Sequence, residues 1–154
     1  MGIRASYLPA GLDGERDPMD YNSELSRRAR GFPIYAAIRA LGRAGIADLV
    51  ERCCALARRF AERLAAHDGV EILNDVVLNQ VLVRFRTPHG DDHDSWTRAV
   101  VQRVQQEGTC WMSATTWRGQ AAMRLSVSSW QTTAADVDRS VQAIRAAVMA
   151  VPAA

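Results

Sequence analysis

The sequence contains no lysine, because all 19 of its basic residues are arginine. A reaction that needs a side-chain amine, such as one that proceeds through a lysine Schiff base, therefore cannot run on this chain alone. Cysteine is also scarce: there are three, and two of them, Cys53 and Cys54, are adjacent. An odd number with this spacing is neither a disulfide framework nor a zinc-binding motif.

Several other signatures are missing. No apolar run approaches the roughly 20 residues that span a bilayer, and the first residues lack the apolar stretch of a secretory signal. We therefore expect a cytoplasmic protein with no membrane partner. The sequence has no GxSxG, GxGxxG or P-loop motif. It also offers no Ser-His-acid set, and no pair of carboxylates that could be placed across a cleft. A self-contained active site is therefore not predicted.

The length and composition suit one domain with an attached arm. The chain has 154 residues, of which 48% are hydrophobic and 23% charged, so it can bury a core. The arginines and three tryptophans, Trp111, Trp117 and Trp130, raise the alternative of a sheet that binds nucleic acid. The net charge of only +2 argues against that alternative. We expect no nucleic-acid partner.

The order of elements predicts an α+β fold. Residues 1–24 have no sustained period, and helices are predicted over residues 26–42 and 46–67. Short strands follow at 70–72 and 78–85, then a helix that ends near Glu107, two strands within 108–130, and a last helix after a capping box that pairs Thr133 with Asp136. We expect a small antiparallel sheet with helices packed on one side, preceded by an irregular arm.

The loop PHGDDHD, residues 88–94, holds two histidines and three aspartates. Such residues can bind a metal, but proline and glycine make this a loop and break the helical spacing of the histidines. We expect no metal site here. The segment instead leads into a helix capped by Asp94 or Ser95.

The segment Gly108–Trp130 carries the candidate site. It is predicted to form two strands joined by a turn at Arg118-Gly119-Gln120. Alternation along the second strand directs Met123, Leu125 and Val127 to the core and Ala122, Arg124, Ser126 and Ser128 to the other face.

Arg124 thus lies on a face of small and hydroxyl-bearing side chains. Its guanidinium could bind a carboxylate through two parallel hydrogen bonds, and a solvated strand arginine is the alternative. Thr115, Thr116, Trp117 and Arg118 form a polar and aromatic cluster at the tip of the hairpin. Ser126 and Thr116 are the hydroxyl groups expected to assist Arg124.

Four segments carry a family resemblance: ELSRRARGFPIYAAIRALGRAG, VEILNDVVLNQVLVRF, EGTCWMSATTWRGQAAMRLSVSSWQTT and ADVDRSVQAI. In this order and spacing they resemble the C-terminal portion of pyridoxal-phosphate-dependent group II amino-acid decarboxylases. This group includes aromatic-L-amino-acid and glutamate decarboxylases and has the fold of aspartate aminotransferase. The resemblance extends from about Ala5 to the last helix.

The resemblance implies that a small α+β domain closes over an amino-acid substrate, next to a large domain that holds pyridoxal 5'-phosphate on a lysine. Residues 1–25 would be the tail of that missing N-terminal domain, 26–44 a connecting helix and 45–154 the small domain. Arg124 falls where these enzymes bind the substrate carboxylate. The implied protein is a homodimeric lyase, truncated here, so that this chain holds no cofactor covalently and is inactive alone.

A free-standing α+β interaction or dimerisation module, derived from such an enzyme, is the alternative. The chain begins with methionine and has a core of its own. The apolar surface left by a missing large domain would favour self-association.

Overall fold

The computed structural model describes residues 28–88 and 90–152. The predicted arm, residues 1–25, lies outside them. The chain divides into two compact units, residues 1–42 and 43–154. Helix α1 (Gly31–Ala65) begins in the first unit with Pro33 in its first turn and is interrupted at Gly42, where φ is 60° and ψ is −173°. The span thus consists of two helical segments that meet at a kink at Gly42, where the first of the two predicted helices ends. Glycine adopts this positive φ at little cost.

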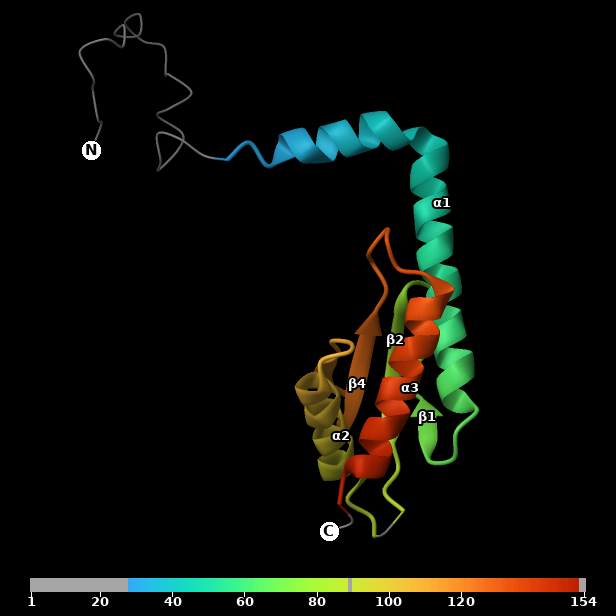
Figure 1. The fold of residues 1–154 in the computed structure, drawn as a ribbon, viewed down its shortest axis with the longest axis vertical. Coiled ribbons are helices and arrows are strands. Elements are labelled where there is room, and N and C mark those ends of the chain that lie inside the picture. The colour runs from blue at the N-terminus through green and yellow to red at the C-terminus, as the bar shows by residue number, and fades with distance from the viewer. Residues whose placement is uncertain (1–27, 89, 153–154) are drawn as a thin grey trace, which may run out of the picture. The chain divides into compact units, whose positions relative to one another are not determined.

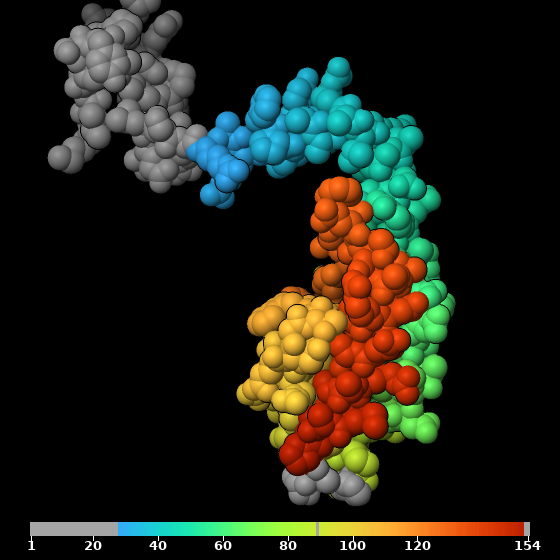
Figure 2. All heavy atoms as spheres, viewed as in Figure 1, coloured from blue at the N-terminus to red at the C-terminus, as the bar shows by residue number. Residues whose placement is uncertain are grey.

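The second unit contains the rest of α1 and all other elements. These are β1 (Val70–Ile72), β2 (Gln80–Phe85), α2 (His93–Glu107), β3 (Ser113–Trp117), β4 (Gln120–Ser126) and α3 (Ala134–Ala150). The strands form one antiparallel sheet in the order β1-β2-β4-β3. Helix α3 lies between α2 and the C-terminal part of α1 (Figures 1 and 2). No helix in the described ranges is both long and apolar enough to cross a membrane.

One face of the sheet packs on all three helices of this unit. The predicted inward residues of the two central strands are almost fully buried: Val81, Val83, Phe85, Met123 and Leu125. They share one apolar cluster with helical residues, among them Phe60, Leu64, Val100, Val104, Val137 and Ile144. The predicted α+β fold, with helices on one side of a small antiparallel sheet, is confirmed.

Thr97 of α2 completes the hydrogen bonding at one end of the β2–β4 ladder, whose last registered pair is Val83 with Met123. Arg86 donates its N–H to Gly69 on the β1 side, so the polar groups of Phe85 point toward β4. There, the Thr97 hydroxyl accepts from the Phe85 N–H and donates to the Phe85 carbonyl, each at 3.1 Å. Thr97 is the one polar side chain counted among the buried residues of the described chain.

Three carboxylates fix the helices of the second unit. Asp92 caps α2 by accepting from the N–H of Ser95 at 3.0 Å. The predicted cap at Asp94 or Ser95 is therefore wrong, because Asp94 lies inside the first turn and pairs with Arg84. The predicted capping box of Thr133 and Asp136 is confirmed at the start of α3.

The third carboxylate joins two helices that are distant in sequence. Asp138 of α3 accepts two hydrogen bonds from Arg59 of α1, at 3.0 Å and 2.7 Å, and lies 3.7 Å from Arg63. A bidentate arrangement of this kind fixes the relative orientation of both side chains. It holds the C-terminal part of α1 against α3.

Replacing Thr97 tests whether its hydroxyl stabilises the end of the β2–β4 ladder. Thr97→Val keeps the volume but leaves the N–H and C=O of Phe85 without their partner in a buried setting. We expect a loss of about 1–3 kcal/mol in the free energy of unfolding. Thr97→Ser keeps the hydroxyl and should lose less. Urea unfolding followed by circular dichroism measures both, and equal losses for the two variants would contradict this role.

The three carboxylates also predict how stability depends on pH. Hydrogen bonds from Ser95, Thr133 and Arg59 hold the pKa of Asp92, Asp136 and Asp138, respectively, below the ordinary value of 3.8. The unfolded chain therefore takes up protons first as the pH falls. The stability these groups contribute is complete above their unfolded pKa values and is lost as the pH falls through the lower folded values. Melting temperatures between pH 7 and pH 3 should show this loss, with a smaller slope for Asp138→Asn.

Candidate functional site

The β3–β4 hairpin turns on two residues. Arg118 and Gly119 have φ values of 49° and 80°, and positive values at both central positions define a type I′ turn. The predicted three-residue turn is therefore one residue too long, because Gln120 already belongs to β4 and pairs with Trp117. Arg118 lies over the Trp117 ring, 5.6 Å from its centroid. The turn fixes the register of every pair in the hairpin.

That register places Arg124 in the middle of the outer face of the sheet. Its partners across the strands are Leu82 on β2 and Ser113 on β3. Leu82 is buried, Ser113 is half-buried and Arg124 is exposed. The guanidinium therefore has an apolar neighbour on one side and a hydroxyl-bearing neighbour on the other.

Arg84, the other arginine within the strands, forms an ion pair with a carboxylate of the protein. Its side chain is only 12% exposed and lies 2.8 Å from the Asp94 carboxylate, which also faces Arg98 at 3.8 Å. Arg124 has no hydrogen bond or ion pair within the described part of the chain. Arg124 is thus the strand arginine that remains available to an external anion.

The structure brings only one of the two predicted hydroxyl residues to Arg124. Ser126 lies two residues further along β4, on the same face and exposed. Thr116 pairs with Ala121, so its side chain lies on the face of the sheet opposite to Arg124. Ser113 and Thr115, neither of which was predicted to assist Arg124, share the face of Arg124. A two-residue turn assumed at Arg118-Gly119 would have identified both by counting outward from the turn.

Two further candidates from the sequence provide no site. In the PHGDDHD loop, Asp92 caps α2 and Asp94 is ion-paired, while His89 lies outside the described residues. No group of three or more potential metal ligands occurs in the portion that the structure describes. Burial raises the pKa of the Cys110 thiol above its usual value, which disfavours the reactive thiolate.

A comparison with known families matches residues 2–87, more than half of the chain, to the family described as "Pyridoxal-dependent decarboxylase conserved domain". The chain belongs to this family.

Among individual proteins, 4-hydroxyphenylacetaldehyde synthase of Rhodiola rosea is 28% identical over 116 residues, which cover 73% of this chain and 23% of the relative. The chain therefore spans about a quarter of the length of this relative.

Solved structures agree on the fold. The Rhodiola rosea synthase has a TM-score of 0.72 and 25% identity, covering 82% of this chain and 27% of that one. Oryza sativa TDC with PLP has a TM-score of 0.74 and 21% identity, covering 86% and 29%. Catharanthus roseus tryptophan decarboxylase, in complex with L-tryptophan, has a TM-score of 0.70 and 20% identity, covering 78% and 25%.

The cofactor of this family is pyridoxal phosphate. Its aldehyde is bound as a Schiff base by a side-chain amine, and this chain has no lysine to supply one. The residues of this chain therefore do not fit a covalent cofactor site. What the described residues offer is the exposed guanidinium of Arg124, which has no hydrogen bond or ion pair among them.

Proposed function

We propose that this chain is the C-terminal, substrate-closing domain of a pyridoxal-phosphate-dependent amino-acid decarboxylase. The single observation that carries the proposal is Arg124, an unpaired guanidinium on an open strand face, in a chain that belongs to this family. The cofactor-bearing domain is a partner that lies outside these residues. By itself the chain is inactive, because it has no side-chain amine to hold the cofactor.

In this proposal, Arg124 receives the α-carboxylate of an amino-acid substrate. The planar guanidinium presents parallel N–H groups that match a carboxylate. Ser113, across from it on β3, and Ser126, two residues further along β4, are further donors. Thr116 contributes nothing here, because its side chain is on the other face. Arg124 thereby orients the carboxylate that is to leave, and the protein gains rate from that fixed geometry.

The division of the chain follows from the same proposal. Residues 1–25 end the cofactor domain, 26–44 connect the two domains and 45–154 form the small domain. The change between the two compact units after Gly42 supports a connection near this point. The full-length protein is a homodimer in this proposal.

A decarboxylation assay tests the proposal in two steps. With added pyridoxal phosphate and aromatic or acidic L-amino acids, the chain alone should release no CO₂. Fusing the cofactor-bearing part of the Rhodiola rosea relative ahead of it should give a protein that does. In that fusion, Arg124→Gln should lower kcat/KM roughly 10²-fold through lost charge-assisted hydrogen bonds, and Arg124→Lys by less.

Arg58→Gln is the matched control, since Arg58 is also an exposed arginine with no ion pair among the described residues. Cofactor absorbance reports whether each fusion has folded. CO₂ release by the chain alone would refute its predicted inactivity. Equal kinetics for Arg124→Gln and Arg58→Gln would refute the role of Arg124.

A second candidate is an interaction or dimerisation module, and one observation favours it. In the first unit, Ile34, Ile38 and Leu41 recur along one side of α1 and are 62%, 51% and 47% exposed. Phe32 and Tyr35 extend this apolar surface and are 71% and 61% exposed. A contiguous apolar surface of this kind marks a site of association.

The isolated chain should therefore self-associate, and light scattering over a range of concentrations measures this. Ile34→Ser together with Ile38→Ser should shift the equilibrium toward monomer by removing buried apolar area. Arg39→Ser, on the same helix, is the control. A monomer at all concentrations would rule out the association module and leave the decarboxylase proposal intact.

A further inference from the structure

Two neighbouring cavities lie where α1 ends against α3, within the second unit. One, of about 250 Å³, has five charged or polar side chains in its wall: Arg63, His67, Asp138, Gln142 and Arg145. The other, of about 310 Å³, is lined mainly by apolar ones, including Leu64, Val70, Phe85, Val148 and Met149. Ala66, His67 and Arg145 line both cavities. The two therefore form one groove with a cationic half and an apolar half.

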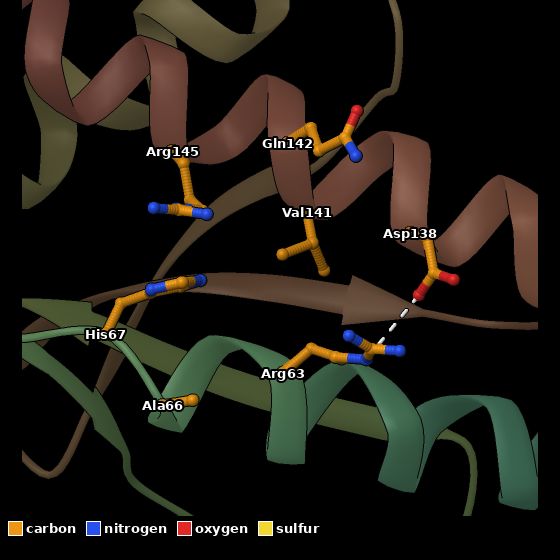
Figure 3. Close-up of a pocket in the computed structure, with 7 residues that line it drawn as sticks. All are labelled: Arg63, Ala66, His67, Asp138, Val141, Gln142 and Arg145. Carbon is orange, nitrogen blue, oxygen red and sulfur yellow. Dashed lines mark ion pairs between the residues drawn. The ribbon is translucent and has the colours of Figure 1, made fainter.

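The cationic half has donors with no partner in the protein. Figure 3 shows Arg145 of α3 and His67, just after α1, reaching toward one another across the cavity. Neither side chain makes a hydrogen bond or an ion pair within the residues that the structure describes. Gln142, one turn before Arg145 on α3, supplies a further free amide. Donors from two elements thus converge on one space.

Two carboxylates lie near these donors, but neither neutralises them. Asp138 is at the far end of the first cavity, where it is bound by Arg59 and faces Arg63. Asp68 lines the second cavity and is exposed, in contact with solvent. Arg145 and His67 therefore keep their capacity to bind an anion.

The apolar half limits what that anion can be. Leu64 and Phe85 are fully buried at its floor, while Met149 is 84% exposed at its rim. An exposed methionine is a flexible apolar side chain that can close over a ligand. A free inorganic anion would leave this half empty, and the small volumes suit a small molecule better than a protein segment.

We propose that this groove binds a small monocarboxylate with an apolar body, its carboxylate on Arg145 and His67 and its body against Leu64, Val148 and Met149. The site lies on the helical side of the fold and uses none of the residues around Arg124. It is independent of the proposed decarboxylase function and would make this chain a ligand-binding module in its own right.

An NMR titration of the full, ¹⁵N-labelled chain with 3-phenylpropionate tests the site. Saturable shifts are expected in residues 64–70 and 141–149. Two partial probes should bind at least about tenfold more weakly: 3-phenylpropanol, which lacks the charge, and acetate, which lacks the apolar body. Equal binding of acetate would show a simple anion site and overturn the proposal.

Variants locate the site. Arg145→Gln should weaken binding of 3-phenylpropionate at least about tenfold, and Met149→Ser should weaken it by a smaller factor. Both residues are exposed, and the dispersion of the spectrum checks that the variants fold. Asp68→Asn should tighten binding, because it removes a repelling charge.

Arg58→Gln is the control and should leave the affinity unchanged. Loss of binding in Arg124→Gln, or shifts centred on residues 113–126, would assign the ligand to the outer face of the sheet and overturn the proposal. Absence of binding, or binding unaffected by Arg145→Gln, would overturn it as well. None of these results bears on the decarboxylation assay, so the two proposals fail separately.

Discussion

The antiparallel pairing of β2 with β4 is the constraint on which the rest of the second unit depends. It aligns Val81 with Leu125 and Val83 with Met123, so that the apolar side chains on the inner face of both strands meet the helices. A slip by one residue would turn Arg124 into the core and Met123 outward. The burial of the apolar face therefore determines on which face Arg124 lies, and no hydrogen bond or ion pair of Arg124 among the described residues is needed for this.

At both ends of this pairing, where the strands stop, side chains form hydrogen bonds with backbone groups that have no further strand partner. At one end, the Thr97 hydroxyl accepts a hydrogen bond from the Phe85 N–H and donates one to the Phe85 carbonyl. At the other, Val127 donates to the Asn79 carbonyl, and the Asn79 side chain donates to the Val127 carbonyl at 2.8 Å. On the β1 side of β2, the Asn74 side chain accepts a hydrogen bond from the Leu82 N–H at 2.7 Å. These bonds let a short sheet satisfy its backbone groups.

Local periodicity was sufficient to predict most of the fold and the face of Arg124. Alternation along β4 depends only on neighbouring residues, as does the capping box of Thr133 and Asp136. The contacts that need distant partners could not be predicted: Arg59 and Asp138 are 79 positions apart in the sequence. One local signal was misjudged, since a two-residue turn at Arg118-Gly119 would have placed Ser113 opposite Arg124 and Thr116 on the other face.

Arginine and lysine side chains suit different chemical tasks. A Schiff base needs an amine that can lose its proton, whereas recognition of a carboxylate needs a cation that keeps its charge, and arginine does only the second. A chain with 19 arginines and no lysine has cations that keep their charge but no side-chain amine to carry the cofactor covalently. If the family's chemistry runs with this chain, it does so because recognition and covalent catalysis are assigned to different parts of the protein. The small sheet then needs only to hold one guanidinium in place, and the pairing of β2 with β4 provides that.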